Sequence, residues 1–156
     1  MSYASQNNRT FFVTSVTNGR RALLQSDRSA RLFMNVLEHY RDKGCFLLHE
    51  FVVMPNHFHL MLTPADGILL QKAMQFIKGG FWFRAKQEFG AKFSIWQASF
   101  TDHRIHDEDD YDRHRKYIHE NPVRAGLVKS AAEFVYSSVS AGIRLDAAPQ
   151  WLKPRR

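Results

Sequence analysis

Apolar and polar positions alternate along this chain with two different spacings, and the change of spacing predicts the order of its elements. Residues 10–17 are β-branched and aromatic and precede an Asn-Gly turn, which is typical of a strand. Over residues 26–43 the apolar positions fall three and four apart, as in a helix. Residues 45–54 and 57–62 are two apolar runs separated by Pro55-Asn56, so they predict a hairpin.

The same spacings return in the second half of the chain. Helical spacing predicts a helix over residues 66–89, and residues 94–105 follow as a fourth strand. We expect a last helix over residues 107–119, because acidic residues in its first turn favour the helix dipole and Pro122 ends it. Two strand-helix-strand units in series predict an α+β fold of the ferredoxin-like, split βαβ type, in which an antiparallel sheet has helices packed mainly on one face.

Length and composition indicate one domain in an aqueous compartment. The chain has 156 residues, and its periodicity weakens after residue 140, so we expect a domain over residues 1–140 and a basic, loose C-terminal extension over residues 141–156. No apolar run approaches the roughly 20 residues that cross a bilayer, and Met1 to Arg9 lacks the apolar segment of a signal peptide. The single cysteine excludes an intramolecular disulfide. We therefore expect a cytoplasmic protein with no membrane partner.

The charge balance adds a class of partner. Twenty-two lysine and arginine residues outweigh fifteen aspartate and glutamate residues, which gives a formal net charge of +7. A domain this basic indicates a polyanion, usually nucleic acid, although a soluble protein can carry the same charge with no such partner.

Two local patterns offer chemistry. His57 and His59 are two residues apart on a predicted strand, so both imidazoles project to one face and could share a metal ion, or could simply be histidines with hydrogen-bond partners. Tyr117 and Asn121 are four residues apart on the last helix and therefore share one helical face, where a tyrosine can also serve only for packing. A divalent ion held by the histidines and an amide oxygen would neutralise the charge that develops when a phenol attacks a phosphodiester. Together, the two patterns describe a coherent phosphoryl-transfer site.

Two segments also resemble a known family. The runs FVVMPNHFHL at residues 51–60 and YIHENPVRAGL at residues 117–127 resemble the signature blocks of the REP-associated tyrosine transposases, bacterial relatives of the single-tyrosine HUH transposases. Residues 74–81, 95–97 and 136–138 are similar to that family as well, so the resemblance extends from about residue 9 to residue 138. It implies a ferredoxin-like fold and makes residues 1–140 the catalytic domain.

The resemblance also implies an activity and roles for four residues. It implies a metal-dependent endonuclease and strand transferase that cleaves single-stranded DNA beside a REP-type hairpin and leaves a 5′-phosphotyrosine and a free 3′-hydroxyl. His57 and His59 match the family's ligands for Mg²⁺ or Mn²⁺, and Tyr117 matches its nucleophile. Asn121 matches a third, polar metal ligand, although asparagine is shorter than the glutamine that some relatives use there. The alternatives are a domesticated hairpin-binding protein that no longer cleaves, and a metal phosphoesterase that activates water.

Binding a DNA hairpin needs contacts beyond the site. Basic side chains supply phosphate contacts and aromatic rings stack on unpaired bases. We expect such a protein to associate with the nucleoid, as a monomer or as a homodimer, since the helix that carries Tyr117 could act in its own subunit or in another. The candidate DNA-binding residues are Arg20, Arg21, Lys72, Lys78, Trp82, Arg84, Lys86, Arg113 and Arg115.

Overall fold

The computed structural model describes residues 9–152. Its strands and helices follow the predicted order. Each of the two strand-helix-strand units is present, and a last helix follows the fourth strand. The elements are β1 (Phe11–Val16), α2 (Asp27–Asp42), β2 (Phe46–Met54), β3 (His57–Pro64), α3 (Leu70–Phe89), β4 (Thr101–Arg104) and α4 (Glu108–Arg124), with 3₁₀ turns at Asn18–Arg20 and Ala131–Glu133.

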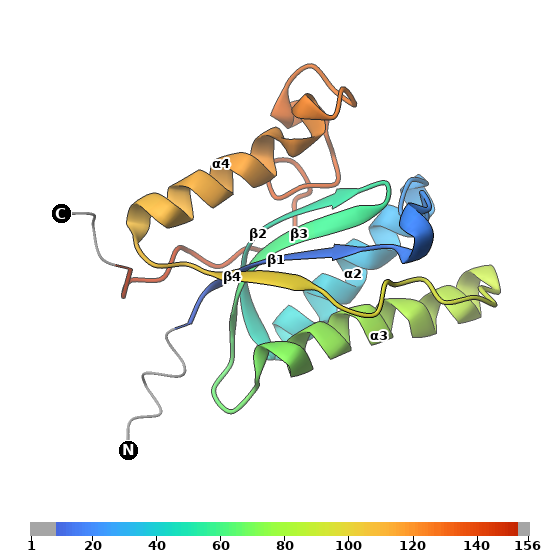
Figure 1. The fold of residues 1–156 in the computed structure, drawn as a ribbon, viewed down its shortest axis with the longest axis horizontal. Coiled ribbons are helices and arrows are strands. Elements are labelled where there is room, and N and C mark those ends of the chain that lie inside the picture. Colours follow the sequence, from blue (N-terminus) through green and yellow to red (C-terminus); the bar gives the residue numbers. More distant parts are fainter. Residues whose placement is uncertain (1–8, 153–156) are drawn as a thin grey trace.

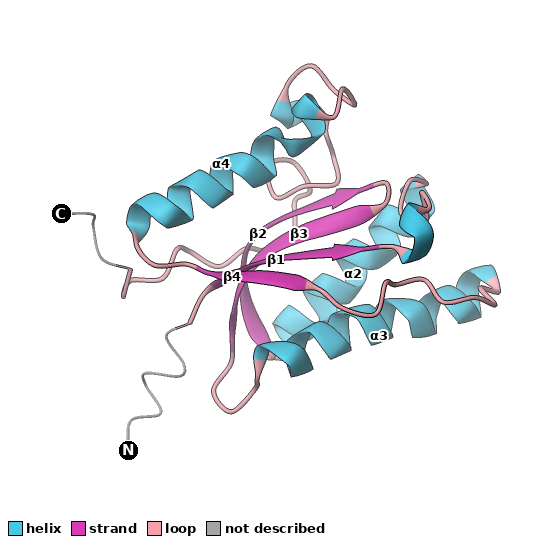
Figure 2. Cartoon of the chain, viewed as in Figure 1, coloured by secondary structure: helices cyan, strands magenta, loops and turns pink. Residues whose placement is uncertain are grey.

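The four strands form one antiparallel sheet in the order β2-β3-β1-β4 (Figure 2). This is the strand order of a ferredoxin-like fold, so the predicted fold class is confirmed. β3 and β1 are the two central strands, and their register places Thr14 directly opposite His59. The histidine pair therefore lies in the middle of the sheet, where neighbouring strands fix its backbone on both sides.

The two faces of the sheet are covered differently (Figure 1). α2 and α3 cover one face, over a large core in which Phe33 contacts Phe58 at 4.6 Å and Phe81 at 5.7 Å between ring centroids. α4 lies across the opposite face, over a smaller cluster that contains Met61 and Ile118. Two of these three helices thus pack on one face, and the third, α4, packs on the other.

The fourth strand and the second helix are shorter than the pattern predicts. The strand expected over residues 94–105 covers only Thr101–Arg104, and the helix expected from residue 66 begins at Leu70. Trp96 explains the first difference: its ring packs against Phe33 and Phe58, and its indole N–H donates to the Lys78 carbonyl at 2.9 Å. Trp96 therefore anchors the preceding loop in the helix-covered core, and its strand-like pairing is limited to one isolated antiparallel bridge with Thr17.

Pro122 does not end α4, and that prediction is wrong. A proline has no N–H to donate to the carbonyl four residues earlier, but it disturbs a helix little in the last turn, where only one bond is lost. The chain keeps its helical bonds beyond this point, since the Ala125 N–H donates to the Asn121 carbonyl at 3.0 Å. The turn ends at Gly126, whose φ of +75° suits a residue without a β-carbon. Arg124 is therefore part of the helix.

The segment after α4 returns to the free edge of β2. The Val53 N–H donates to the Tyr136 carbonyl at 2.8 Å, and the Ser138 N–H donates to the Phe51 carbonyl at 2.9 Å. These bonds add a short strand-like pairing to the sheet edge.

None of the helices among residues 9–152 is long and apolar enough to cross a membrane.

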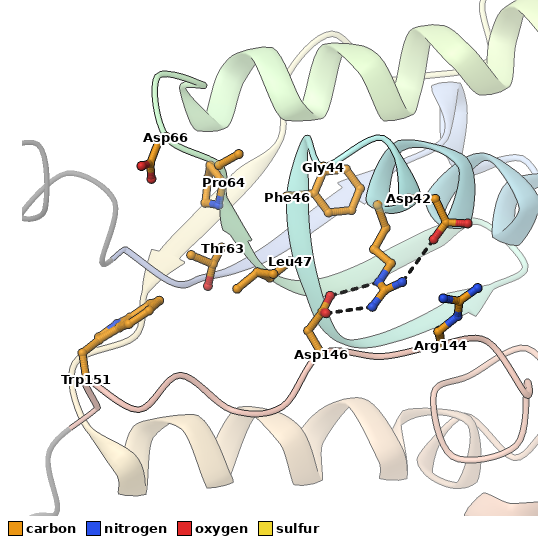
Figure 3. Close-up of a pocket in the computed structure, with 12 residues that line it drawn as sticks. Asp42, Gly44, Phe46, Leu47, Thr63, Pro64, Asp66, Arg144, Asp146 and Trp151 are labelled. Atoms are coloured by element: carbon orange, nitrogen blue, oxygen red, sulfur yellow. Dashed lines mark hydrogen bonds and ion pairs between the residues drawn. The ribbon is translucent and has the colours of Figure 1, made fainter.

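The described part of the C-terminal extension is anchored as well. The Asp146 carboxylate accepts from the Arg41 guanidinium at 2.8 Å (Figure 3). It also accepts from the Leu48 N–H at 2.9 Å. Residues 153–156, with the basic end of the extension, lie outside the described residues. The boundary at residue 140 stays a prediction, and residues 141–152 contact β2 and α2 through Asp146.

Candidate active site

The predicted ligands lie on the face of the sheet that α4 covers. Side chains alternate along β3, so Phe58 points into the core beneath α2 and α3 while His57 and His59 point towards α4. The two imidazole rings lie side by side with their centroids 4.9 Å apart. The spacing read from the sequence therefore brings the two rings together on one face.

His59 is buried and has one free ring nitrogen. Its Nδ1 lies 2.7 Å from the Thr14 hydroxyl of the neighbouring strand, and its ring stacks on Phe12 at 5.2 Å between centroids. Its Nε2 is buried without a hydrogen-bond partner. Burial, followed by the positive charges of a protonated His57 and of Arg124, lowers the pKa of His59 to about 3. The ring is therefore neutral at physiological pH, the state in which an imidazole binds a metal.

His57 is oriented by a neighbour in the β2-β3 turn. Its Nδ1 lies 2.7 Å from the Asn56 side-chain oxygen, which can only accept, so the proton sits on Nδ1 and the lone pair on Nε2. Burial lowers the pKa of His57, the nearby Asn121 amide opposes that change, and the charge of Arg20 lowers it further. Such an outer hydrogen bond fixes the tautomer of metal-binding histidines.

α4 supplies the other two candidate residues. The Asp107 side chain caps this helix by accepting from the Asp110 N–H at 2.7 Å, and Ile118 is fully buried against the sheet. With Ile118 turned inwards, Tyr117 and Asn121 lie on the flank that faces β3 and β1. The ring of Tyr117 is 5.2 Å from the His59 ring in an edge-to-face contact, and the side chain is 36% exposed. The Tyr117 ring is thus beside His59 and partly open to solvent.

The donor atoms of this site fit a divalent cation. The Asn121 side-chain oxygen is buried without a hydrogen-bond partner, like His59 Nε2. An unpartnered buried polar atom costs about 1–3 kcal/mol, so two on one face require an explanation. Neutral imidazoles and an amide oxygen are acceptable ligands for Mn²⁺, and less typical ones for Mg²⁺, which prefers oxygen. His57, His59 and Asn121 are the residues that would hold the ion.

Arg124 was missed by the sequence interpretation. Its guanidinium lies over the ring of Tyr117, 4.5 Å from the centroid, and its charge also reaches His59. It stands seven positions after Tyr117, two helical turns along the same flank. The signal was the continuation of helical spacing through residue 124, which is hidden when Pro122 is taken as the end of the helix. Arg124 places a permanent positive charge beside the phenol.

A second cluster of titratable groups lies further along α4. The Asp110 carboxylate accepts from His103 Nε2 at 2.8 Å, from the His106 N–H at 2.9 Å and from Arg113 at 3.1 Å, and His114 adjoins it. The i, i+4 pair Asp110 and His114 was its sequence signal. Three of these residues could contact a metal ion, yet the donors around the carboxylate already satisfy it. This cluster ties the first turn of α4 to β4.

The basic candidates divide between the two faces. Arg20 lies close enough to His57 to affect its pKa, and its positive φ of 56° is a strained value for a residue with a β-carbon. Arg113 is bound to Asp110, and Arg115 lies 3.6 Å from Asp112 on α4. Arg21 sits over the Phe93 ring at 5.1 Å. Of these, Arg20 is next to the predicted ligands.

The other five candidates belong to α3, on the opposite side of the sheet (Figure 1). Lys86 lies over the Trp82 ring at 4.3 Å, and Trp82 is 37% exposed. Lys72 and Arg84 line a groove between α2 and α3. Lys78 is half-buried, donates to the Gln97 carbonyl at 3.0 Å, and has its pKa lowered by burial. The structure brings these residues together along α3 and separates them from Tyr117.

Comparison with known proteins supports a family assignment. The family described as Transposase IS200 like matches residues 5–121, which is more than half of the chain. The REP-associated tyrosine transposase of Escherichia coli (strain K12) is 30% identical over 133 residues, which cover 83% of this chain and 75% of that protein. A Haemophilus influenzae protein, whose name assigns it provisionally to the same group, is 26% identical over 155 residues, or 90% of this chain and 85% of the relative.

A solved structure agrees with the sequence matches. The structure of a REP-associated tyrosine transposase bound to a REP hairpin matches this chain with a TM-score of 0.67 and 28% identity, and the match covers 96% of this chain and 93% of that chain. The fold match and the sequence matches thus agree. The chain belongs to the IS200-like transposase family and, within it, to the REP-associated tyrosine transposases, a group of DNA-processing enzymes.

Proposed function

We propose that this protein is a metal-dependent endonuclease and strand transferase that acts on single-stranded DNA at a hairpin through a 5′-phosphotyrosine intermediate. One observation carries the proposal. The phenol ring of Tyr117 contacts the ring of His59, and on this face, within residues 9–152, His59 Nε2 and the Asn121 side-chain oxygen are buried without partners. A nucleophile and free ligand atoms for a cation thus meet on one face of the sheet.

The reaction exchanges one phosphodiester for another. The Tyr117 oxygen attacks the scissile phosphorus and loses its proton to solvent, while the bond from phosphorus to the 3′-oxygen of the preceding nucleotide breaks. The departing 3′-oxygen takes up a proton, and the 5′-phosphate stays esterified to Tyr117. A 3′-hydroxyl can then attack this ester, release the phenol and reseal the strand. No ATP is consumed, because each ester bond that breaks is replaced by another.

Two kinds of positive charge would support this exchange. A divalent ion on His57, His59 and Asn121 would polarise the phosphate and orient it for in-line attack. Arg124 lies over the Tyr117 ring and can contact the negative phosphate oxygens of the transition state. Arg20 lies beside His57 and can bind a phosphate next to the cleaved one.

Recognition of the hairpin is proposed to use more of the surface. The solved relative is bound to a REP hairpin, and by its similarity this chain is proposed to take a hairpin of the same class. Arg20, Arg113 and Arg115 are candidates on or next to the α4 face. The α3 residues Lys72, Lys78, Trp82, Arg84 and Lys86, and Arg21 beside the turn after β1, are candidates for flanking DNA. Because these contacts are largely electrostatic, we expect the affinity to fall steeply with salt.

A tyrosine substitution tests the function. Labelled single-stranded hairpins from genomic repetitive palindromes are incubated with Mn²⁺ or Mg²⁺ and scored for a protein-DNA adduct that resists denaturant. Tyr117→Phe removes the attacking oxygen, so it should abolish the adduct and leave hairpin affinity within about two-fold. Tyr136→Phe is the matched control, since that phenol donates to Asp27 outside the site.

The alternatives give different outcomes in the same experiment. Hairpin binding with no cleavage in either metal would support a protein that only binds DNA. Cleavage that persists in Tyr117→Phe and releases a free 5′-phosphate would instead support a phosphoesterase that activates water. Either result would reject Tyr117 as the nucleophile.

A further inference from the structure

A buried contact ties the far flank of α4 to the sheet. His119 Nε2 donates to the Glu50 carboxylate of β2 at 2.5 Å, and the Ser138 hydroxyl donates to the same oxygen at 2.7 Å. The Glu50 side chain is only 14% exposed and that of His119 only 24%. Three segments of the chain, namely α4, β2 and the strand-like segment after α4, therefore meet at one carboxylate oxygen.

The backbone around Glu50 is built to aim this carboxylate at α4. β2 has a bulge between Leu48 and Glu50, where its register against β3 shifts by one residue. Before the bulge Leu48 points into the core beneath α2 and α3, whereas after it Phe51 does so, and the alternation of faces is reversed. Glu50 consequently shares the α4 face with Val52 of the smaller cluster. Without the extra residue, Glu50 would point into the apolar core.

Ser138 is fixed independently of the carboxylate. Its backbone N–H donates to the Phe51 carbonyl at 2.9 Å, and its hydroxyl oxygen accepts from the Phe51 N–H at 3.2 Å. The segment that follows α4 is thereby held against β2 at the residue next to Glu50. The hydroxyl group is therefore already in place to hold the carboxylate for His119.

Helix geometry connects this contact to the nucleophile. Successive residues are about 100° apart around an α-helix, so His119 lies about 200° from both Tyr117 and Asn121. Between the two flanks, the buried contact is made by Ile118, and apolar contacts alone do not specify how far a helix is rotated about its axis. The Asp110–His103 hydrogen bond holds the first turn of α4, seven residues before Tyr117, whereas the His119–Glu50 hydrogen bond fixes the rotation two residues from the nucleophile. Rotation of α4 would move the Tyr117 ring away from His59.

We infer that Glu50 is a positioning residue of the active site: through His119 it sets the rotation of α4 and so aims the Tyr117 hydroxyl at the scissile phosphate. The inference rests on the proposed function, because it concerns the same nucleophile. Glu50 and His119 are not among the proposed ligands or the proposed nucleophile. Their effect is expected in the rate of phosphoryl transfer, since a misplacement of about 1 Å can cost about 10²-fold in rate.

The test compares substitutions of Glu50 in the full chain. Glu50→Ala removes the acceptor for His119 and Ser138, whereas Glu50→Gln keeps an oxygen that can accept both bonds. Glu108→Ala is the matched control, because it removes an exposed carboxylate from the same helix. For each variant, the single-turnover rate of adduct formation is measured at saturating hairpin, together with the hairpin Kd and the thermal midpoint.

We expect Glu50→Ala to lower the adduct rate about 10–100-fold with Kd changed less than two-fold, while Glu50→Gln and Glu108→Ala keep rates near that of the wild type. A second readout does not depend on activity. With 3-fluorotyrosine incorporated and the Tyr117 signal assigned from Tyr117→Phe, the ¹⁹F resonance of Tyr117 should shift or broaden in Glu50→Ala and in His119→Phe, and stay unchanged in Glu108→Ala.

The outcomes separate this inference from the proposed function. If the wild type forms an adduct and Glu50→Ala forms it at the same rate, the positioning role is overturned and the function stands. If hairpin affinity, rate and thermal midpoint all fall in parallel, the contact serves only folding, and the positioning role is again overturned. If Glu50→Ala does not fold, His119→Phe and Ser138→Ala take its place. An absent adduct in the wild type rejects the function, and the ¹⁹F spectrum still tests the link to Tyr117.

Discussion

β3 separates two regions that bury their residues in opposite ways. On the face covered by α2 and α3, Phe58 and Leu60 are fully buried among apolar side chains. On the face covered by α4, His59 and Asn121 are withdrawn from water while one polar atom of each lacks a partner. The first face contributes hydrophobic stabilisation, although Ser15 Oγ is buried there without a partner. On the second face, the two unpartnered atoms, each costing about 1–3 kcal/mol, belong to a residue that contacts the Tyr117 ring and to one a helical turn from Tyr117. Their position beside this tyrosine indicates that the α4 face is kept for chemistry.

Adjacent residues of β3 provide the strongest test of this comparison. Phe58→Ala should lower the free energy of unfolding by about 3–5 kcal/mol, because it opens a cavity in the large core. His59→Ala should leave the protein folded and abolish adduct formation, because it removes a ligand. Urea unfolding and the adduct assay are measured on both variants. A His59→Ala protein as unstable as Phe58→Ala, or one that still forms the adduct, would contradict the division of roles.

Removing the added metal should likewise affect the activity of the α4 face and not the stability contributed by the other face. A chelator is expected to stop adduct formation, and added Mn²⁺ should restore the reaction. In protein prepared without metal, the chelator should leave the thermal midpoint unchanged. In His57→Ala, restoration should require more Mn²⁺, because one ligand is missing. Full activity in the chelator would refute the proposed ion on His57, His59 and Asn121.

The next expected effect concerns the arginine beside the phenol. Arg124→Ala should lower the adduct rate about 10²-fold, comparable to the loss of one donor at a developing anion. Arg124→Lys should recover part of that rate, since it keeps the charge but loses the planar group over the ring. Hairpin affinity is measured beside the rate. Equal losses in affinity and rate would make Arg124 a binding residue only.

A smaller effect is expected at Asp146, which anchors the C-terminal extension away from the proposed site. Burial raises the pKa of Asp146, but the hydrogen bonds from Arg41 and from the Leu48 N–H outweigh this, so the net pKa is lowered. Because the pKa of Asp146 is lower in the folded state, its contribution to the free energy of unfolding is fully present above the unfolded pKa, near 4. That contribution is lost as the pH falls through the folded pKa. Asp146→Asn should therefore cost about 1–3 kcal/mol at pH 7, and less below about pH 4. Urea unfolding at both pH values checks this, and the adduct rate at pH 7 should not change.

The smallest effect distinguishes two neighbouring glycines of α3. An added β-carbon at Gly79 meets no atom within 4 Å, whereas at Gly80 it would lie 2.8 Å from Cε2 of Tyr40. Gly79→Ala should thus raise the free energy of unfolding by about 0.5–1 kcal/mol. Gly80→Ala should gain nothing or lose stability, because the Tyr40 ring must leave its stack on Phe76. Equal gains in the two variants would mean that this contact is loose.

The sequence predicts individual elements of the site better than their assembly. Alternation on a strand suffices to put His57 and His59 on one face, and helical spacing suffices to align Tyr117 with Asn121. That α4 crosses the second face of the sheet depends on tertiary packing of Ile118, which no local pattern specifies. The chemistry of phosphoryl transfer, rather than periodicity, joined the two patterns, and the family resemblance implied the same set of residues.

The features that sequence reasoning missed have local physical causes. Arg124 was hidden by the rule that proline ends a helix, which fails where a single lost bond falls in the last turn. Glu50 was hidden by the bulge in β2, because a shift of one residue reverses which positions face α4. Trp96 resembled a strand residue but fills the core from a loop. Each of these is decided by contacts between distant segments.

The placement of α4 over its own sheet has a consequence for stoichiometry. In this structure Tyr117, both histidines and Asn121 come from a single polypeptide, so a monomer that keeps this arrangement would show activity in direct proportion to its concentration. Under the proposed mechanism, the one phenol beside the histidines can hold one DNA end at a time. Joining two ends would thus demand either two copies of the protein or two successive turnovers by one.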